Sequence, residues 1–265
     1  MKPEGEVVVK EDGGIAFVTL NRLEKKNALS PSLLDSLAES MRGLSEGGTT
    51  RCAVLEGAGG TFSVGMDLEA VAAMPPGQGH LLIGEGGPLR NALAAVEQAP
   101  FAVIAMIRGH AAGAACELAV TCDLRVGSAN ALMGMPPAKL GIVYPAEGLE
   151  RFIWTVGTAT TRRLFYTSRY FGGEELLRMG LLDFMCEDEE LEEFTMELAE
   201  AICRNSPVSM AGHKGSLRLI SGAASLSPER RAVIDELVRE SFASADAAEG
   251  IAAFKEKREP EFGNP

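Results

Sequence analysis

Apolar positions near the start of the chain follow first the spacing of strands and then that of a helix. Two β-rich runs, at 6–10 and 15–20, flank the turn sequence Glu-Asp-Gly-Gly at 11–14, which predicts a hairpin. Ser30 and Pro31 are typical of a helix N-cap and the position after it, and apolar residues then recur at helical spacing. The pattern therefore predicts an amphipathic helix directly after the hairpin.

The order of strand, small-residue loop and helix then occurs twice. In chain order the predicted segments are a strand at 52–56, a glycine-rich loop at 57–65, a short helix from about Asp67, a helix at 88–98, a strand at 101–107, a loop with Gly109 and Gly113, a helix to about Thr121 and a strand at 122–126. Alternation of this kind predicts an α/β fold in which helices cover the sheets.

Beyond about Thr158 the spacing is almost entirely helical. The longer predicted helices cover 191–204, 208–220 and 228–242. We therefore expect two parts, an α/β core at 1–200 and a helical region at 201–265. The helices of the second part carry apolar stripes that the core is not expected to cover fully, which favours self-association.

The composition excludes several classes of protein. With 265 residues, of which 46% are apolar and 23% charged, the chain fits a soluble globular protein better than a disordered or fibrous one. A chain of this length buries enough surface to hold a core without disulfide bonds. Its formal net charge of −12 argues against nucleic acid or an anionic membrane as the main partner.

Cysteine usage and hydropathy bear on the compartment. Five scattered cysteines without a CxxC pair suit the reducing cytoplasm, and they favour small buried thiols over a disulfide framework or a zinc site. The first 14 residues lack the apolar core of a signal peptide. The most apolar stretch, at 99–124, includes four ionisable residues that are costly in hydrocarbon, so we expect no membrane span.

Several common motifs are incomplete. The loop at 57–62 begins like a dinucleotide fingerprint, but Phe62 stands where the last glycine is required. The segment at 61–65 resembles a nucleophile elbow, but Thr61 replaces its first glycine. A nicotinamide or flavin site and a serine hydrolase triad are therefore not expected. The histidines, which lack metal-ligand spacing, are His80, His110 and His213.

Both predicted strand-to-helix loops are built from small residues. A glycine-rich loop such as 57–65 lets peptide N–H groups face a concave surface, and a helix that begins near Gly113 leaves its first N–H groups unpaired. Two such donors that converge from different loops form an oxyanion hole. Composition alone leaves a second interpretation open, in which the glycines and alanines only permit close packing.

Ordered segments along nearly the whole chain resemble one known family. They are NRLEKKNAL at 21–29, FSVGMDL at 62–68, GHAAGAACELA at 109–119, CDLR at 122–125, KLGI at 139–142, ELLRMGL at 175–181 and AFKEKR at 253–258. These segments resemble the enoyl-CoA hydratase/isomerase (crotonase) superfamily, with Leu176 where alanine is usual. The resemblance implies an α/β fold with a ββα spiral core, a C-terminal α-helical trimerisation region, a homotrimer or homohexamer, and an acyl-CoA substrate.

The resemblance also implies the family's shared chemistry, in which two backbone N–H groups stabilise a thioester enolate. These donors fall on Val64 and Ala114. The larger side chain of Val64 is acceptable because only its peptide N–H is required. Ala114 stands where glycine is common, which would cause strain only if its φ were positive.

The resemblance places Glu117 on one of the family's catalytic glutamates. It lies three residues beyond Ala114 on nearly the same helix face, and its apolar sequence neighbours suggest a setting that disfavours the charged carboxylate. The alternative is a carboxylate that only interacts with the helix dipole.

The family's second glutamate falls on Pro137, which can neither donate nor accept a proton. Hydration with paired carboxylates is therefore not expected, whereas double-bond isomerisation with Glu117 as the one base is favoured. Glu147 is a candidate substitute acid. Tyr144 is a candidate hydrogen-bonding group, and packing is an equal alternative for it.

By the same resemblance the CoA part of the substrate is bound by two regions. The path of the adenine and pantetheine is implied for Lys25, Lys26, Ala28, Gly65, Met66, Asp67 and Leu68. Phe254 and Lys257 resemble tail residues that commonly reach the CoA of a neighbouring subunit. The alternative for each lysine is an ordinary surface charge without a role in CoA binding. No cofactor is expected beyond the CoA that the substrate carries.

We therefore expect a cytoplasmic enoyl-CoA isomerase or hydratase of the kind that acts in fatty acid metabolism. Two alternatives stay open. A CoA-thioester hydrolase or decarboxylase would use the same oxyanion hole with a differently placed acid. A non-catalytic acyl-CoA-binding protein would keep only the pocket.

Overall fold

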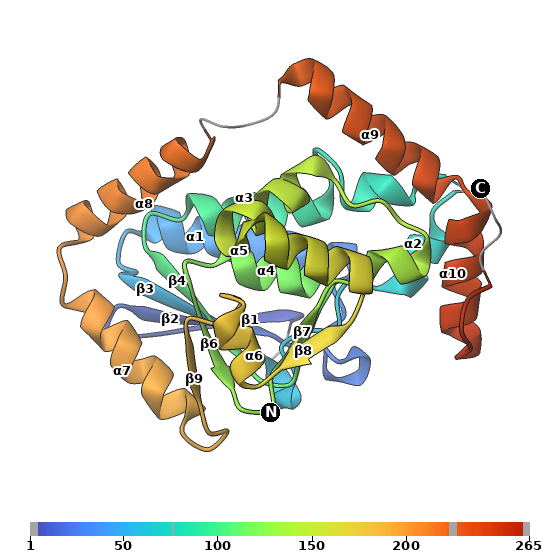
Figure 1. The fold of residues 1–265 in the computed structure, drawn as a ribbon. Helices are drawn as coiled ribbons and strands as arrows, with labels where there is room; N and C mark the ends of the chain where they lie inside the picture. The colour runs from blue at the N-terminus through green and yellow to red at the C-terminus, as the bar shows by residue number, and fades with distance from the viewer. Residues whose placement is uncertain (1–4, 76, 223–226, 262–265) are drawn as a thin grey trace.

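Two sheets form the centre of the computed structural model, which describes residues 5–75, 77–222 and 227–261 (Figure 1). The larger sheet has the strand order β1-β2-β3-β4-β6-β9, and the smaller has the order β5-β7-β8. The strands are β1 (Val7–Asp12), β2 (Ile15–Leu20), β3 (Cys52–Gly57), β4 (Ala102–Ile107), β5 (His110–Ala112), β6 (Leu124–Ser128), β7 (Leu132–Gly134), β8 (Tyr170–Gly172) and β9 (Phe184–Cys186).

Helices cover the larger sheet and form the C-terminal part of the chain. The α-helices are α1 (Pro31–Gly47), α2 (Leu68–Ala73), α3 (Pro88–Gln98), α4 (Ala114–Thr121), α5 (Ala146–Thr167), α6 (Glu174–Arg178), α7 (Leu191–Cys203), α8 (Pro207–Gly222), α9 (Pro228–Phe242) and α10 (Ala245–Glu256). Short 3-10 helices are η1 (Leu23–Lys25), η2 (Ala58–Gly60), η3 (Gly79–Leu82) and η4 (Pro137–Leu140). The α/β fold expected from the sequence is confirmed. None of the described helices combines the length and hydropathy needed to cross a bilayer.

The predicted hairpin and first helix are present. β1 and β2 pair antiparallel, and the Ser30 side chain accepts a hydrogen bond from the Leu33 N–H at the start of α1. From β2 onwards, neighbouring strands of the larger sheet run parallel. Parallel neighbours place their carboxyl ends at the same edge, so the loops after β3 and β4 meet there.

Two hydrogen bonds join these loops. The Ser63 N–H donates to the His110 carbonyl at 2.9 Å, and the Ala112 N–H donates to the Ser63 carbonyl at 3.2 Å. The small-residue loops of the two strand-to-helix units are thus fixed side by side, as the interpretation of a shared site requires.

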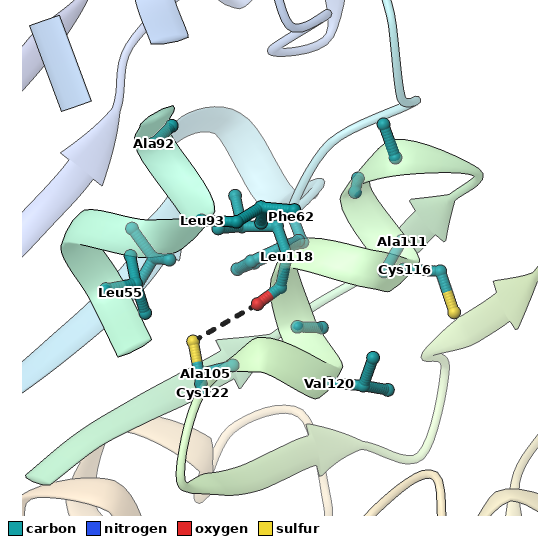
Figure 2. Close-up of a cluster of buried hydrophobic side chains, with 14 of the residues drawn as sticks. Leu55, Phe62, Ala92, Leu93, Ala105, Ala111, Cys116, Leu118, Val120 and Cys122 are labelled. Carbon is teal, nitrogen blue, oxygen red and sulfur yellow. Dashed lines mark hydrogen bonds between the residues drawn. The ribbon is translucent and has the colours of Figure 1, made fainter. Parts of the chain in front are cut away.

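Alternate side chains of β3 and β4 pack on opposite faces of the sheet. Ala53 and Leu55 belong to the core under α1, α3 and α4, whereas Val54 and Ile104 pack on the other side with residues of α7. Figure 2 shows Phe62, from the loop after β3, against Leu93 of α3 and Leu118 of α4. Because β3 is buried on both faces, its first four residues are all apolar and do not alternate with polar ones.

The region beyond residue 158 is mostly helical, as predicted, but it also contains strands that were not predicted. It holds the three-residue strands β8 and β9, which are too short to show a period of two, and α5 already begins at Ala146. Residue 200, the predicted boundary of the core, lies inside α7, which continues to Cys203 and packs on the sheet. The α7 helix therefore belongs with the core, and the division into two parts stays a prediction.

Packing of α3 on the core can be tested with matched truncations. Leu93 is 1% exposed and Leu81 is 48% exposed. We expect Leu93→Ala to lower the free energy of unfolding by about 2–5 kcal/mol, because it opens a cavity between helices. Leu81→Ala should cost less than about 1 kcal/mol. Urea unfolding measures both, and equal losses would contradict the packing described.

Candidate active site

A cavity of about 640 Å³ opens where the two loops meet. Its walls come from both loops, from η4, and from the C-terminal helices α9 and α10, which contribute Phe242 and Phe254. Most of the residues predicted for the site line it: Lys25, Lys26, Ala28, Val64, Gly65, Met66, Asp67, Leu68, Ala114 and Phe254. Glu117, Glu147 and Lys257 are not among the lining residues.

The loop after β3 is held in place beside α4. The Leu29 N–H donates to the Gly65 carbonyl at 2.8 Å, and the Asp67 N–H donates back to the Leu29 carbonyl at 3.0 Å. Gly65 has a φ of +91°, and a Cβ there would lie 2.5 Å from the Ala112 carbonyl oxygen. Only glycine permits this close approach of the two loops.

Two backbone amides, those of Val64 and Ala114, belong to the same cavity wall. Ala114 is the first residue of α4, and its N–H has no acceptor among the residues that the structure describes. The Val64 N–H makes a long hydrogen bond of 3.3 Å to the Lys26 carbonyl. An anionic oxygen is a better acceptor than a carbonyl, so it can compete for this donor.

The turn before α4 supplies the conformation that Ala114 avoids. Gly113 has φ +53° and ψ −120° and caps the helix without a side-chain hydrogen bond. Ala114 is not among the residues with positive φ, so its side chain causes no strain. The N-terminus of α4, which Ala114 places in the cavity wall, adds a favourable potential for negative charge there.

Glu117 occupies a different setting from the apolar one expected. Its side chain is fully buried, and its carboxylate binds two guanidinium groups. Arg90 of α3 and Arg151 of α5 each approach Oε1 to 2.7 Å, and Tyr144 donates its hydroxyl to Oε2 at 2.5 Å. The expectation of apolar surroundings is wrong because it considered only the neighbours of Glu117 on its own helix.

Tyr144 separates Glu117 from the cavity, which it lines. Burial, and then the adjacent Glu117 carboxylate, raise the pKa of the Tyr144 phenol well above its usual value. The phenol therefore stays neutral. Gly148 makes room for this contact, since a Cβ there would meet the Tyr144 ring at 2.4 Å and Glu117 Oε1 at 3.1 Å.

Arg90 is the partner that the sequence did not reveal. It lies 27 residues before Glu117, and its Nε also donates to the Ile83 carbonyl at 2.9 Å. Burial opposes its charge, but the Glu117 carboxylate raises the pKa of the Arg90 guanidinium. No local motif signals such a pair. The only sequence indication is a basic residue in a helix, α3, that is otherwise amphipathic.

The predicted substitute acid lies outside the cavity. Glu147 forms an ion pair with Arg231 of α9, and it lines a second cavity of about 400 Å³ that also exposes Arg151. Pro137, on which the resemblance places the family's second glutamate, lines the cavity. Neither Pro137 nor Glu147 therefore supplies a second acid at the wall that Val64 and Ala114 line.

The remaining carboxylates of the cavity wall have structural partners. Asp67 accepts from Arg22 at 2.6 Å and from the Glu69 N–H at 2.9 Å at the start of α2. Burial opposes ionisation, but the Arg22 hydrogen bond lowers the pKa of Asp67. Glu69 pairs with Lys25 at 2.8 Å. These groups lie along the predicted CoA path. Lys26, which also lines the cavity, has a left-handed backbone with φ +49° at the end of η1.

The tail residues divide between two positions. Phe254 lines the cavity of its own chain, whereas the resemblance suggested contact with a neighbouring subunit. Lys257 ends α10 with a left-handed backbone and does not reach the cavity lining.

The described part of the chain offers little support for a metal site or for a cysteine nucleophile. No group of three or more metal-binding side chains occurs within it. Burial raises the pKa of the Cys116 and Cys122 thiols to about 12, so they are poor nucleophiles.

A pair of backbone donors in a cavity with mostly apolar walls defines a site for a substrate whose oxygen gains negative charge. Residues 10–265 match the enoyl-CoA hydratase/isomerase family. The chain belongs to this family of acyl-CoA enzymes.

Its relatives include two kinds of enzyme. The chain is 29% identical to methylmalonyl-CoA decarboxylase of Escherichia coli K12, over 94% of each chain, and 30% identical to the short-chain-enoyl-CoA hydratase of Clostridium acetobutylicum, over 96% of each. A solved methylmalonyl-CoA decarboxylase with 2-nitronate-propionyl-CoA superposes with a TM-score of 0.92 at 28% identity, covering 99% of this chain and 100% of that one. An enoyl-CoA hydratase from Bacillus anthracis gives 0.77 at 31% identity, covering 97% and 99%.

The role of the Ala114 amide can be tested by a proline substitution that removes its N–H and leaves the helix in place. Proline is tolerated at the first position of a helix, so Ala114→Pro removes the N–H and should keep the fold. We expect turnover to fall about 100-fold to 1,000-fold, the usual effect of losing one oxyanion donor.

Glu174→Pro is the matched control for this substitution. Glu174 is also the first residue of a helix, α6, and it follows Gly173, which has φ +56° and ψ −145°. Circular dichroism should be native for both variants. Unchanged turnover in Ala114→Pro would remove this amide from the reaction.

Proposed function

We propose that the protein removes CO2 from a 2-carboxyacyl-CoA of the malonyl or methylmalonyl type. In this reaction the bond between Cα and the carboxylate breaks, its electron pair forms the thioester enolate, and CO2 leaves. The Val64 and Ala114 amides stabilise the enolate oxygen. A proton from water then adds to Cα, which gives the acyl-CoA product.

The observation that carries this proposal is the position of Glu117. Decarboxylation forms an enolate without a protein base, whereas isomerisation and hydration both require proton transfer by a side chain. Glu117 is bound by Arg90, Arg151 and Tyr144 and does not line the cavity. Pro137 offers no replacement.

The cavity walls support the same reaction. Val71, Ile83, Pro137 and Ile142 form an apolar part of the wall, and this part gives a substrate carboxylate few hydrogen bonds. Loss of hydration disfavours the charged carboxylate more than the transition state, in which the charge moves to the thioester oxygen. The Tyr144 hydroxyl already donates its hydrogen bond to Glu117, so it is not free to stabilise the substrate carboxylate.

The comparisons favour this choice without deciding it. The superposition on methylmalonyl-CoA decarboxylase is closer than that on the Bacillus anthracis hydratase, although the sequence identity is slightly lower. Enoyl-CoA hydratases are nevertheless frequent among the similar proteins.

Isomerisation of an enoyl-CoA remains the second candidate. It was predicted from the loss of the second glutamate at Pro137, and it requires Glu117 to leave its two arginines and act as the base. The hydratase alternative requires a second acid as well. Both stay predictions that the assay below tests.

Assembly and location are proposals of the same kind. We propose a homotrimer or homohexamer, and exposed apolar side chains on the C-terminal helices support it, namely Val208, Leu217, Leu219, Ile220 and Val233. We also propose a cytoplasmic enzyme that uses no cofactor beyond the CoA of its substrate.

The substrates can be compared in one mass-spectrometric assay. With methylmalonyl-CoA we expect propionyl-CoA, a product lighter by one CO2. With 2-enoyl-CoA and 3-enoyl-CoA we expect neither addition of water nor migration of the double bond, because no free carboxylate reaches the substrate. Hydration or isomerisation without decarboxylation would overturn the proposal. Inertness on all three substrates would also overturn it and would favour the non-catalytic acyl-CoA-binding alternative.

A further inference from the structure

Two arginines and one tyrosine bind the buried Glu117 carboxylate. Arg90 and Arg151 form ion pairs with Glu117 Oε1. Glu117 Oε2 accepts hydrogen bonds from Arg90 Nη2 at 2.8 Å and from the Tyr144 hydroxyl. Arg151 also binds Glu97 at 3.0 Å. The four charged groups therefore form a neutral set of two cations and two anions.

Arg90 depends on Glu117 more than Arg151 does. Its side chain is 11% exposed, its Nε donates to the Ile83 carbonyl, and its Nη1 has no partner among the described residues. Glu117 is its one ion-pair partner in the described chain. If Glu117 took up a proton, both arginines would lose a buried counter-charge, which is costly at low dielectric. The two arginines thus oppose any role of Glu117 as a base.

Glu117 is connected to the cavity through the Tyr144 hydroxyl. It lies one helical turn from the Ala114 amide, and its hydrogen-bond partner Tyr144 lines the cavity. Without the two cations, the Glu117 carboxylate would lose its ion-pair partners and would be available to accept a proton, as a general base requires. The amides would then stabilise an enolate formed by removal of a Cα proton.

We propose that Arg90 and Arg151 determine the specificity of this site by keeping Glu117 from acting as a base on the substrate. This inference rests on the proposed function, in which the enolate forms by loss of CO2. The arginines are positioning residues because they act through Glu117 and do not line the substrate cavity. A purely structural ion pair would have no effect on which bond of the substrate breaks.

The experiment measures exchange of the Cα hydrogens of propionyl-CoA in D2O by mass spectrometry. Propionyl-CoA has no carboxylate to lose, so exchange reports a protein base directly. We expect the native enzyme to exchange the Cα hydrogens no faster than the Glu117→Gln variant does. For Arg90→Met with Arg151→Met we expect exchange about 100-fold faster, the usual contribution of a general base. Adding Glu117→Gln to this double variant should abolish the gain.

Folding of the variants is checked by circular dichroism and by CoA binding. The single variant Arg151→Met serves if the double variant does not fold, because its side chain borders the second cavity, where water can replace it. It should show a smaller gain that also requires Glu117. Arg151→Lys, which keeps the charge, should show none.

Three results would overturn the inference. They are exchange by the native enzyme that depends on Glu117, a folded Arg151→Met or double variant without faster exchange, and a gain that survives Glu117→Gln. Decarboxylation of methylmalonyl-CoA by the native enzyme is measured separately. Its absence would overturn the proposed function, whereas the exchange results alone decide whether the arginines keep Glu117 from acting as a base.

Discussion

The Glu117 carboxylate lies without solvent contact between Arg90 and Arg151, and the chemistry open to the cavity depends on that contact. A buried carboxylate is stable only when hydrogen bonds and opposite charges replace its hydration. Here the partners come from α3, α5 and the segment before α5, so the contact also joins three elements around α4. The same arrangement neutralises Glu117 and positions Tyr144, so the cavity has donors for an oxyanion while the Glu117 carboxylate stays ion-paired.

The topology of the sheet explains why the donors meet. β3 and β4 are parallel neighbours, so the loops that follow them leave the sheet at the same edge. Gly65 lets these loops approach closely, and the Ala114 N–H at the start of α4 has no acceptor among the described residues. An oxyanion site built from backbone depends on strand order and helix start, and it tolerates side chains as different as those of Val64 and Ala114.

Local features of the fold and site were predictable from the sequence. The cap at Ser30, the turn between β1 and β2 and the small-residue loops depend on near neighbours, and the structure confirms these elements. Most of the residues that the family segments predicted for the site line the cavity. The charge around Glu117 was not predictable in this way, because Arg90 and Arg151 lie 27 and 34 residues away. Contacts between helices that are distant in sequence leave no spacing pattern, so apolar neighbours on α4 gave the wrong surroundings.

A crystal structure with a non-cleavable analogue of a 2-carboxyacyl-CoA tests the central claim most directly. The account predicts the thioester oxygen about 2.7–3.1 Å from the nitrogens of both Val64 and Ala114, the usual range for an oxyanion donor. It also predicts that Glu117 keeps its contacts with Arg90 and Arg151. A thioester oxygen bound elsewhere, or a Glu117 carboxylate turned away from the arginines and against Cα, would contradict it.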